Sequence, residues 1–156
     1  MTLGLKDPLV RAGFVLGLGF AGFTDGIVFH QILGWHHLVC VTVDCQVASV
    51  AQLERENTQD GYFHLALGLV VLTGTALLFH AARSTSLAGK GRILLGAILA
   101  GGGLFELGEG IINHQLLGIH HVLPGHPHQL AFDLLYLANG ALFAALGIGL
   151  VRSPRP

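Results

Sequence analysis

Four long apolar stretches set the strongest limit on how this chain can fold. They cover about residues 14–33, 61–80, 93–117 and 129–151. Hydrophobic residues make up 52% of the 156 residues and charged residues only 11%, unlike a water-soluble domain. Each stretch is long enough for a hydrocarbon core of about 30 Å, which takes about 20 helical residues to cross. Because lipid cannot bond the backbone, and no barrel-like alternation is present, we predict one all-α transmembrane domain over residues 1–156.

The basic residues predict how these spans are oriented. Seven of the eight Lys and Arg side chains fall at the termini or between the second and third stretches, and only Arg55 lies on the other side. Basic residues favour the cytoplasmic side. We therefore expect both termini in the cytoplasm, with the other two connections in the periplasm or outside the cell. The formal net charge of -1 offers no basic surface to nucleic acid, so the expected partner is the lipid bilayer.

A thirteen-residue phrase occurs twice and contains six of the ten histidines. The copies are residues 25–37 and 109–121, which are identical at eight of thirteen positions and each read acid-Gly-Ile-x-x-His-Gln-x-Leu-Gly-x-His-His. The surrounding repeats, about residues 13–82 and 96–151, hold two spans each. An even number of spans gives both repeats the same direction. We therefore predict a four-helix bundle of two parallel two-helix repeats with pseudo-two-fold symmetry.

Glycine is abundant in the first and third spans. The chain has 23 glycines, and those of the first span include Gly13, Gly17, Gly22 and Gly26 at spacings of four or five residues. Small residues let helices approach closely in lipid. The pattern predicts a bundle centred on the first and third spans, although the same packing could also join copies into a homo-oligomer.

The acidic side chains of the spans lack basic partners. Asp25, Glu106, Glu109 and Asp133 fall inside the predicted spans, where no Lys or Arg accompanies them. A charge at the bilayer centre costs about 2.5–3.5 kcal/mol on insertion scales, so these acids need a partner. Protons or a metal cation can supply it. The neighbouring histidines favour a metal, since four-helix bundles with inward carboxylates and histidines bind paired metals.

This reasoning predicts a His/carboxylate metal site, with more than one metal, in the outer half of the bundle. The ligands expected first are His30, His64, His114, Asp60, Asp133 and Glu109, with Asp25 as the counterpart of Glu109. The paired histidines, expected at a rim or a second metal, are His36, His37, His120 and His121. Polar residues expected around these ligands are Glu106, Asn113, Gln31, Gln115, His126 and His128.

The metal and the role of these groups have alternatives. Imidazole suits zinc, copper, iron and nickel, and carboxylates shift the preference towards zinc, iron or manganese. The outer location favours copper. Iron and zinc stay open, because Met1 is the single methionine and the thioether ligands typical of a Cu(I) pathway are missing. Three other interpretations compete: histidines that merely sit at the interface, protonated carboxyls bonding between helices, and a proton relay.

The first outer connection contains both cysteines. Cys40 and Cys45 most simply form a small-loop disulfide in an oxidising compartment, with a metal-ligand pair as the alternative. We expect the polar residues 41–59 to carry a short surface helix.

Two functions remain in competition. If the metal is redox-active, the protein is an oxidoreductase that uses O2, a quinol or another small molecule. If the metal is cargo, the protein binds, delivers or transports it. Acids and histidines buried in a closed bundle favour a permanent site. Transport is disfavoured because His80 is nearly the only ionisable group in the cytoplasmic half of the spans.

Both copies of the phrase, with Asp60-Gly61-Tyr62-Phe63-His64 between them, resemble a bacterial membrane-protein family called domain of unknown function 2243. The resemblance covers nearly the whole chain. It implies a small four-span protein of the bacterial inner membrane. It also implies an association with copper-linked respiratory assembly, which makes copper the metal expected first and respiratory or copper-handling proteins the expected partners.

Overall fold

The chain folds into four long helices, with no β-strand among the described residues. The computed structural model describes residues 4–40 and 45–153. The helices are α1 (Pro8–Asp25), α2 (Val50–Ser84), α3 (Gly91–Glu109) and α4 (Gln129–Arg152), and π-helical segments η1 (Gly26–Ile32) and η2 (Gly110–Leu116) continue α1 and α3. All four helices are long and apolar enough to cross a membrane. The predicted all-α bundle with four spans is confirmed, and the pseudo-two-fold relation of its repeats stays a prediction.

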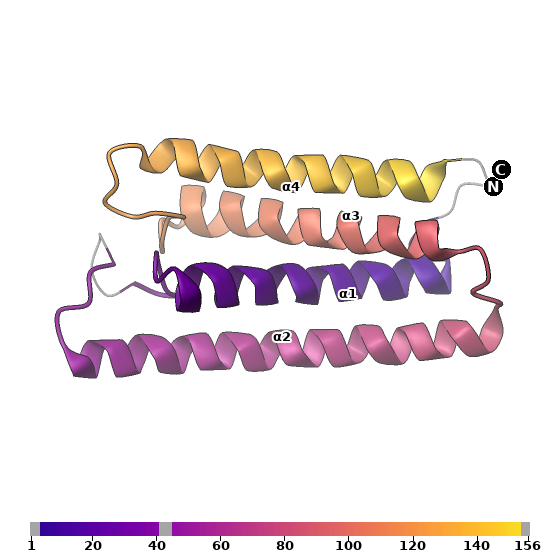
Figure 1. Cartoon of the computed structure of the whole chain (residues 1–156), viewed down its shortest axis with the longest axis horizontal. Helices are drawn as coiled ribbons and strands as arrows, with labels where there is room; N and C mark the ends of the chain where they lie inside the picture. Colours follow the sequence, from indigo (N-terminus) through magenta and orange to yellow (C-terminus); the bar gives the residue numbers. More distant parts are fainter. Residues whose placement is uncertain (1–3, 41–44, 154–156) are drawn as a thin grey trace.

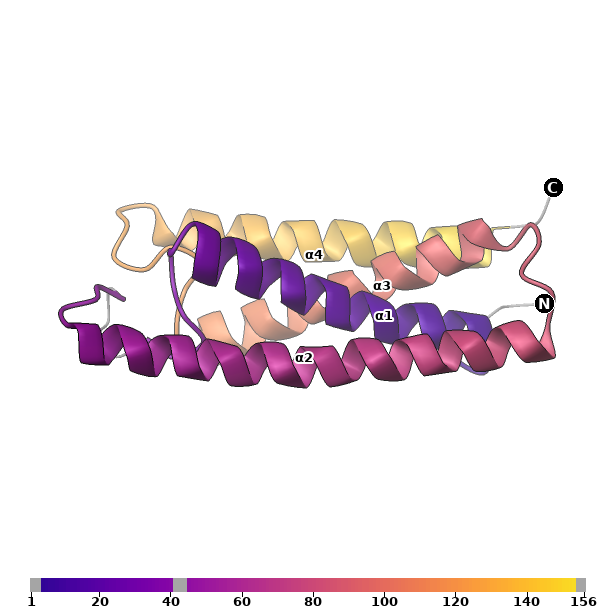
Figure 2. The same ribbon diagram turned by 60° about the horizontal axis from the view of Figure 1, so that its bottom comes forward.

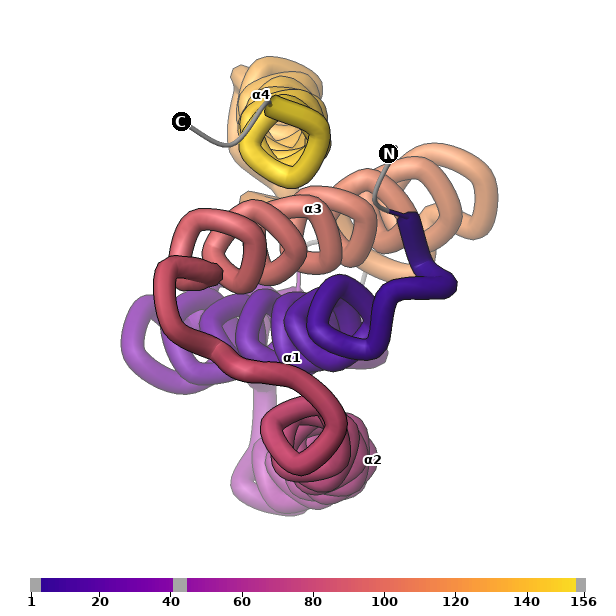
Figure 3. The backbone as a smooth tube through the Cα atoms, turned by 90° about the vertical axis from the view of Figure 1, so that its right-hand side faces the viewer, coloured from indigo at the N-terminus to yellow at the C-terminus, as the bar shows by residue number. Residues whose placement is uncertain are grey.

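The helices lie in a row, with α1 and α3 at the centre. These two helices cross, as Figure 2 shows, and α2 packs outside α1 while α4 packs outside α3 (Figures 1 and 3). The start of α1, the end of α4 and the α2–α3 connection share one end of the molecule (Figure 1). The connections that follow η1 and η2 lie at the opposite end, which we call the histidine end because both copies of the phrase finish there.

Glycines allow α1 and α3 to touch backbone to backbone. A Cβ atom at Gly17 would meet the carbonyl oxygen of Ile98, and one at Gly101 would meet the carbonyl oxygen of Phe14. No larger side chain fits this crossing without moving a backbone, which is how small residues act in helix pairs within lipid. The prediction that the first and third spans form the centre is confirmed.

Helix α2 begins earlier than the hydropathy pattern indicates. The Ser49 hydroxyl accepts a hydrogen bond from the Gln52 backbone N–H at 3.2 Å and caps the helix at Val50. Residues 50–59, expected as part of a loop with a short surface helix, therefore form the first turns of α2 itself; residues 41–44 of that loop lie outside the described part. Cys40 and Cys45 form the expected disulfide.

At the histidine end, the first and third spans finish in π-helical rather than α-helical turns. The Leu33 N–H donates to the Val28 carbonyl and the Leu117 N–H to the Ile112 carbonyl, both at 2.8 Å across five residues. Gly34 and Gly118 follow with φ of 58° and 56°, a left-handed conformation that glycine adopts readily. The chain turns there, and the second and third histidines of each phrase come next.

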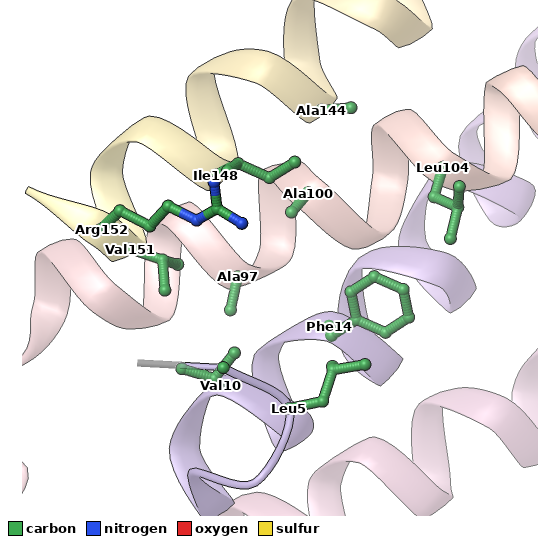
Figure 4. A pocket seen from close by; sticks show the side chains of 11 residues that line it. Leu5, Val10, Phe14, Ala97, Ala100, Leu104, Ala144, Ile148, Val151 and Arg152 are labelled. Atoms are coloured by element: carbon green, nitrogen blue, oxygen red, sulfur yellow. The ribbon is translucent and has the colours of Figure 1, made fainter. Parts of the chain in front are cut away.

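The opposite end of the bundle holds an apolar groove of about 370 Å³. Figure 4 shows its apolar walls, which include Val10, Ala97 and the Phe14 ring, with the Arg152 side chain at one side. No histidine or acidic residue lines this groove. The ionisable groups that the sequence singles out are therefore concentrated at the histidine end.

Candidate metal centre

Two groups of three potential ligands are buried at the histidine end, one from each copy of the phrase. One group consists of Asp25, His30 and His36. The other consists of Glu109, His114 and His120. In each group the three ligand atoms lie within 4.8 Å of one another, and all six side chains are buried. Each group pairs one carboxylate with two imidazoles, a donor set that suits transition metals.

The imidazole rings of the two groups contact one another. The His36 and His120 rings lie parallel, with centroids 4.6 Å apart and an interplanar angle of 8°. His30 lies edge-on to His36 at 4.8 Å, and His114 lies edge-on to His120 at 5.1 Å. The six side chains therefore form one continuous cluster rather than two separate sites.

Hydrogen bonds fix which nitrogen these histidines can offer. His36 Nδ1 lies 2.8 Å from the Val122 carbonyl oxygen, and His120 Nδ1 lies 3.0 Å from that of Leu38. Because a carbonyl oxygen can only accept, each Nδ1 carries a proton, and in the neutral imidazole this leaves the lone pair on Nε2. His30 Nδ1 similarly donates to Asp60 Oδ1 at 3.0 Å. Metal-binding histidines are held in this way by their second nitrogen.

The atoms left over are buried and unbonded. In the two groups they are Nε2 of His30, His36 and His120, both ring nitrogens of His114, and Oδ2 of Asp25. Each such atom costs about 1–3 kcal/mol if nothing satisfies it. His30 Nε2 approaches Asp25 Oδ2 at 3.2 Å, but in an orientation that makes no hydrogen bond. The residues present therefore fit metal ions as the missing partners.

Asp60, from α2, holds the first group in place by accepting hydrogen bonds from residues in and next to it. Its carboxylate accepts from His30, from His37 Nδ1 at 2.7 Å and from the Leu38 N–H at 2.8 Å. These three bonds tie η1, the following connection and α2 together.

Asp133, from α4, accepts hydrogen bonds next to the second group in the way that Asp60 does next to the first. It accepts from His121 Nδ1 at 2.6 Å, from the Val122 N–H at 3.0 Å and from Gln115 at 3.2 Å. His114 Nδ1 lies 3.6 Å away. Among the predicted ligands, Asp60, Asp133, His37 and His121 thus lie around the two groups rather than in them.

The remaining predicted residues lie further from the cluster. His64 belongs to neither group, and its ring packs between Phe23 and Phe63 with centroids 5.7 and 5.9 Å away. Glu106 accepts from Asn139 at 2.8 Å. The other predicted surroundings are exposed or partly exposed: Gln31, Asn113, Gln115, His126 and His128.

Sequence reasoning missed Tyr136 and Glu56. The Tyr136 hydroxyl donates to Glu109 Oε2 at 2.7 Å and lies 3.4 Å from Asp25 Oδ1, so it touches carboxylates of both groups. Glu56 is buried, 3.8 Å from His37 Nε2. Both follow helical spacing from a predicted residue, since Tyr136 lies three after Asp133 and Glu56 four before Asp60. That signal could have found them.

The electrostatic setting keeps His36 neutral. Burial, followed by the neighbouring His120 and His30, lowers the pKa of the His36 imidazole to about 2. A neutral imidazole is the form that binds metal. His36, which was expected at a rim or a second metal, is 1% exposed and lies in the interior.

The fold and this cluster define a small integral membrane protein with four membrane-spanning helices, whose buried histidines and carboxylates could hold metal. The chain belongs to the family described as "Predicted membrane protein (DUF2243)", whose model matches residues 12–154. The family resemblance noted in the sequence is therefore confirmed. No curated protein and no solved structure matches the chain.

Proposed function

We propose that this protein is a metalloprotein of the bacterial inner membrane that holds two transition-metal ions side by side and uses them as an oxidoreductase. One ion would be bound by Asp25, His30 and His36. The other would be bound by Glu109, His114 and His120. The observation that carries the proposal is the set of buried, unbonded Nε2 atoms within these two groups. Each ion would supply Lewis acidity or electron transfer, and the chain supplies its ligands and their orientation.

The geometry disfavours two simpler explanations. Interfacial histidines would face the lipid headgroups, whereas His36 and His120 are only 1% and 2% exposed. A hydrogen bond between helices is an incomplete explanation for Asp25, because the bond from the Tyr136 hydroxyl to Oδ1 leaves Oδ2 without a hydrogen-bond partner. A proton relay through these groups is compatible with bound metal. Tyr136, which touches both carboxylates, would be the natural donor in such a relay.

Copper is the metal we expect first, followed by iron and zinc. Each group offers two imidazoles and one carboxylate, which suit all three metals. The two cysteines are joined in a disulfide and cannot act as thiolate ligands. By the positive-inside tendency of Lys and Arg, the histidine end faces the periplasm or the cell exterior. Respiratory or copper-handling proteins would then be the partners that the site meets.

The burial of the ligands supports catalysis over delivery. Glu109 is the most exposed of the six at 7%, and three of the four imidazole rings are held by hydrogen bonds at Nδ1 within the protein. An ion in such a site would be released only if the bundle opened. A delivery protein needs exchange, so metal binding and delivery is the alternative that weak, exchangeable binding would favour.

Metal analysis of protein purified without added metal tests this proposal. We expect about two ions per chain, as in other paired-metal helix bundles, and a redox-active ion visible by electron paramagnetic resonance. His30→Ala and His114→Ala should each lose metal, whereas the matched control His80→Ala, at the far end of α2, should keep it. Absence of stoichiometric metal, with both variants behaving like wild type, would overturn the proposal.

A further inference from the structure

A second groove leads from the lipid-facing side of the bundle to the candidate ligand Glu109. It has a volume of about 290 Å³ and lies beside α3 and η2, with Phe63 of α2 in its wall. Leu104 and Ile112, which also line it, are each 50% exposed. These side chains belong to spans, so their exposed surface faces the bilayer. The groove is therefore accessible from lipid.

The groove contains an amide without a partner. The Asn113 side chain lines it next to Glu109 and makes no hydrogen bond to the described residues. An unbonded amide in an apolar medium is costly. Asn113 and Glu109 thus place a hydrogen-bond donor and an acceptor in a groove whose other walls are mostly apolar.

The two copies of the phrase differ at this position. Phe29 stands in the first copy where Asn113 stands in the second. The Phe29 ring covers the first group, with centroids 5.5 Å from Trp35, 6.0 Å from His36 and 6.4 Å from Tyr136. The shorter Asn113 cannot make these contacts. The second copy therefore has no aromatic ring at this position, and the groove reaches Glu109 there.

A single side chain, that of Phe63, separates the groove from His30 of the first group. The Phe63 ring in its wall stacks on His30, with centroids 5.6 Å apart and an interplanar angle of 21°. A molecule in the groove would touch Glu109 directly and would be separated from His30 by one aromatic ring.

We propose that this groove binds the head group of a lipid-soluble hydroquinone whose tail stays in the bilayer. This deepens the proposed function, on which it rests, by naming a substrate class. One phenolic hydroxyl would donate to Glu109 and accept from the Asn113 amide, and the ring would pack on Phe63. A volume of about 290 Å³ lies just below the roughly 300–1,000 Å³ of small-molecule pockets, which suits a single ring. An acyl chain would leave the amide unbonded.

The test is calorimetric binding of a decyl-tailed hydroquinone to the purified full chain, with metal content measured on the same samples. Asn113→Phe, which copies the residue of the first phrase, should fill the groove and weaken binding by more than about tenfold. Asn113→Leu, which keeps the size but removes the amide, should weaken it about tenfold, as expected for one lost hydrogen bond. Ile111→Phe adds the same ring at the adjacent exposed position outside the groove and should bind like wild type.

A hydroxyl-free analogue, decylbenzene, separates this ligand from an ordinary lipid chain. It should bind at least about tenfold more weakly than the hydroquinone. Equal binding of the two molecules, or unchanged binding by Asn113→Phe, would overturn the inference. Protein that contains metal but does not bind the hydroquinone refutes the groove assignment alone. Protein that binds the hydroquinone normally but never contains metal refutes the metal function and leaves the groove's ligand in place.

Discussion

At the scale of single residues, the hydrogen bonds at the histidine Nδ1 atoms determine which ring nitrogens are left to bind a metal. Three imidazoles donate a hydrogen bond from Nδ1. His36 and His120 donate to backbone carbonyl oxygens, and His30 donates to the Asp60 carboxylate. Their Nε2 lone pairs are thereby fixed in number and in direction. Ligands held in this way lose little freedom when a metal binds, which favours tight binding.

Replacing Asp60 tests this support. In Asp60→Asn one acceptor oxygen becomes a donor, so the three bonds from His30, His37 and the Leu38 N–H can no longer all form. We expect metal affinity to fall about 10–100-fold, measured by competition with a chelator. Asp7→Asn is the control, because Asp7 only caps α1 and Asn caps equally well. Unchanged affinity in Asp60→Asn would contradict the assigned role.

Acid should destabilise the metal-free protein through His36. Its pKa is about 2 in the fold and about 6.5 in the unfolded chain. Between these values the unfolded chain binds a proton that the folded protein does not, so stability falls as the pH drops below about 6.5. The melting temperature should be lower at pH 5 than at pH 7 in detergent, and this difference should shrink in His36→Gln. The exposed His80→Gln should keep the wild-type difference; an unchanged difference in His36→Gln would refute the prediction.

At the scale of elements, the π-helical segments explain what sequence periodicity could and could not reveal. The acid and first histidine of each phrase are five residues apart, which an α-helix places about 140° from each other at 100° per residue. In a π-helix, residue i+5 bonds back to residue i, so this spacing brings Asp25 near His30 and Glu109 near His114. The repeated phrase singled out these four residues, and their role as ligands stays a prediction. Nothing in an apolar pattern distinguishes the two helix types.

The second histidines could not be placed by periodicity at all. His36 and His120 follow left-handed glycines in irregular chain, and their positions depend on bonds to Val122 and Leu38 from the other half of the molecule. Such long-range contacts leave no trace in local spacing. This is why a rim position was considered for residues that lie in the interior.

The crossing of α1 and α3 should tolerate no side chain at its closest points. In Gly101→Ala the new methyl group meets the Phe14 carbonyl oxygen, and overpacking of this kind costs about 1–3 kcal/mol. Gly149→Ala, where a Cβ meets nothing within 4 Å, should be neutral or stabilise the helix by up to about 1 kcal/mol. Thermal unfolding in detergent measures both. Equal stability of the two variants would show that the crossing is looser than described.

At the scale of the whole molecule, hydropathy predicted the four spans but not which span packs against which. Apolar length alone identifies a span, because lipid imposes it. The row in which α2 contacts α1 and α4 contacts α3 depends on which faces carry glycine. The early start of α2 depends on the Ser49 cap and brings Glu56 to the cluster. Polar residues near a span can thus belong to the site even when their hydropathy suggests a loop.

Cysteine labelling tests how the molecule lies in the membrane. Glu54→Cys introduces a thiol near the histidine end, and Ser86→Cys introduces one in the α2–α3 connection. By the positive-inside tendency, a membrane-impermeant thiol reagent should label the first variant in intact cells and the second only after permeabilisation. Wild type is the control, since both native cysteines are in a disulfide. The reverse pattern would invert the proposed orientation.

The crossed bonds between His36 and Val122 and between His120 and Leu38 also constrain the order of assembly during biosynthesis. Each half of the protein supplies the acceptor that sets the tautomer in the other half. The first two spans, inserted alone as the chain leaves the ribosome, therefore carry the first ligand group without the contact that prepares His36. The centre can mature only after the connection between η2 and α4, which contains Val122, has been made. Metal loading should accordingly be a late, post-insertional event that acts on both groups together.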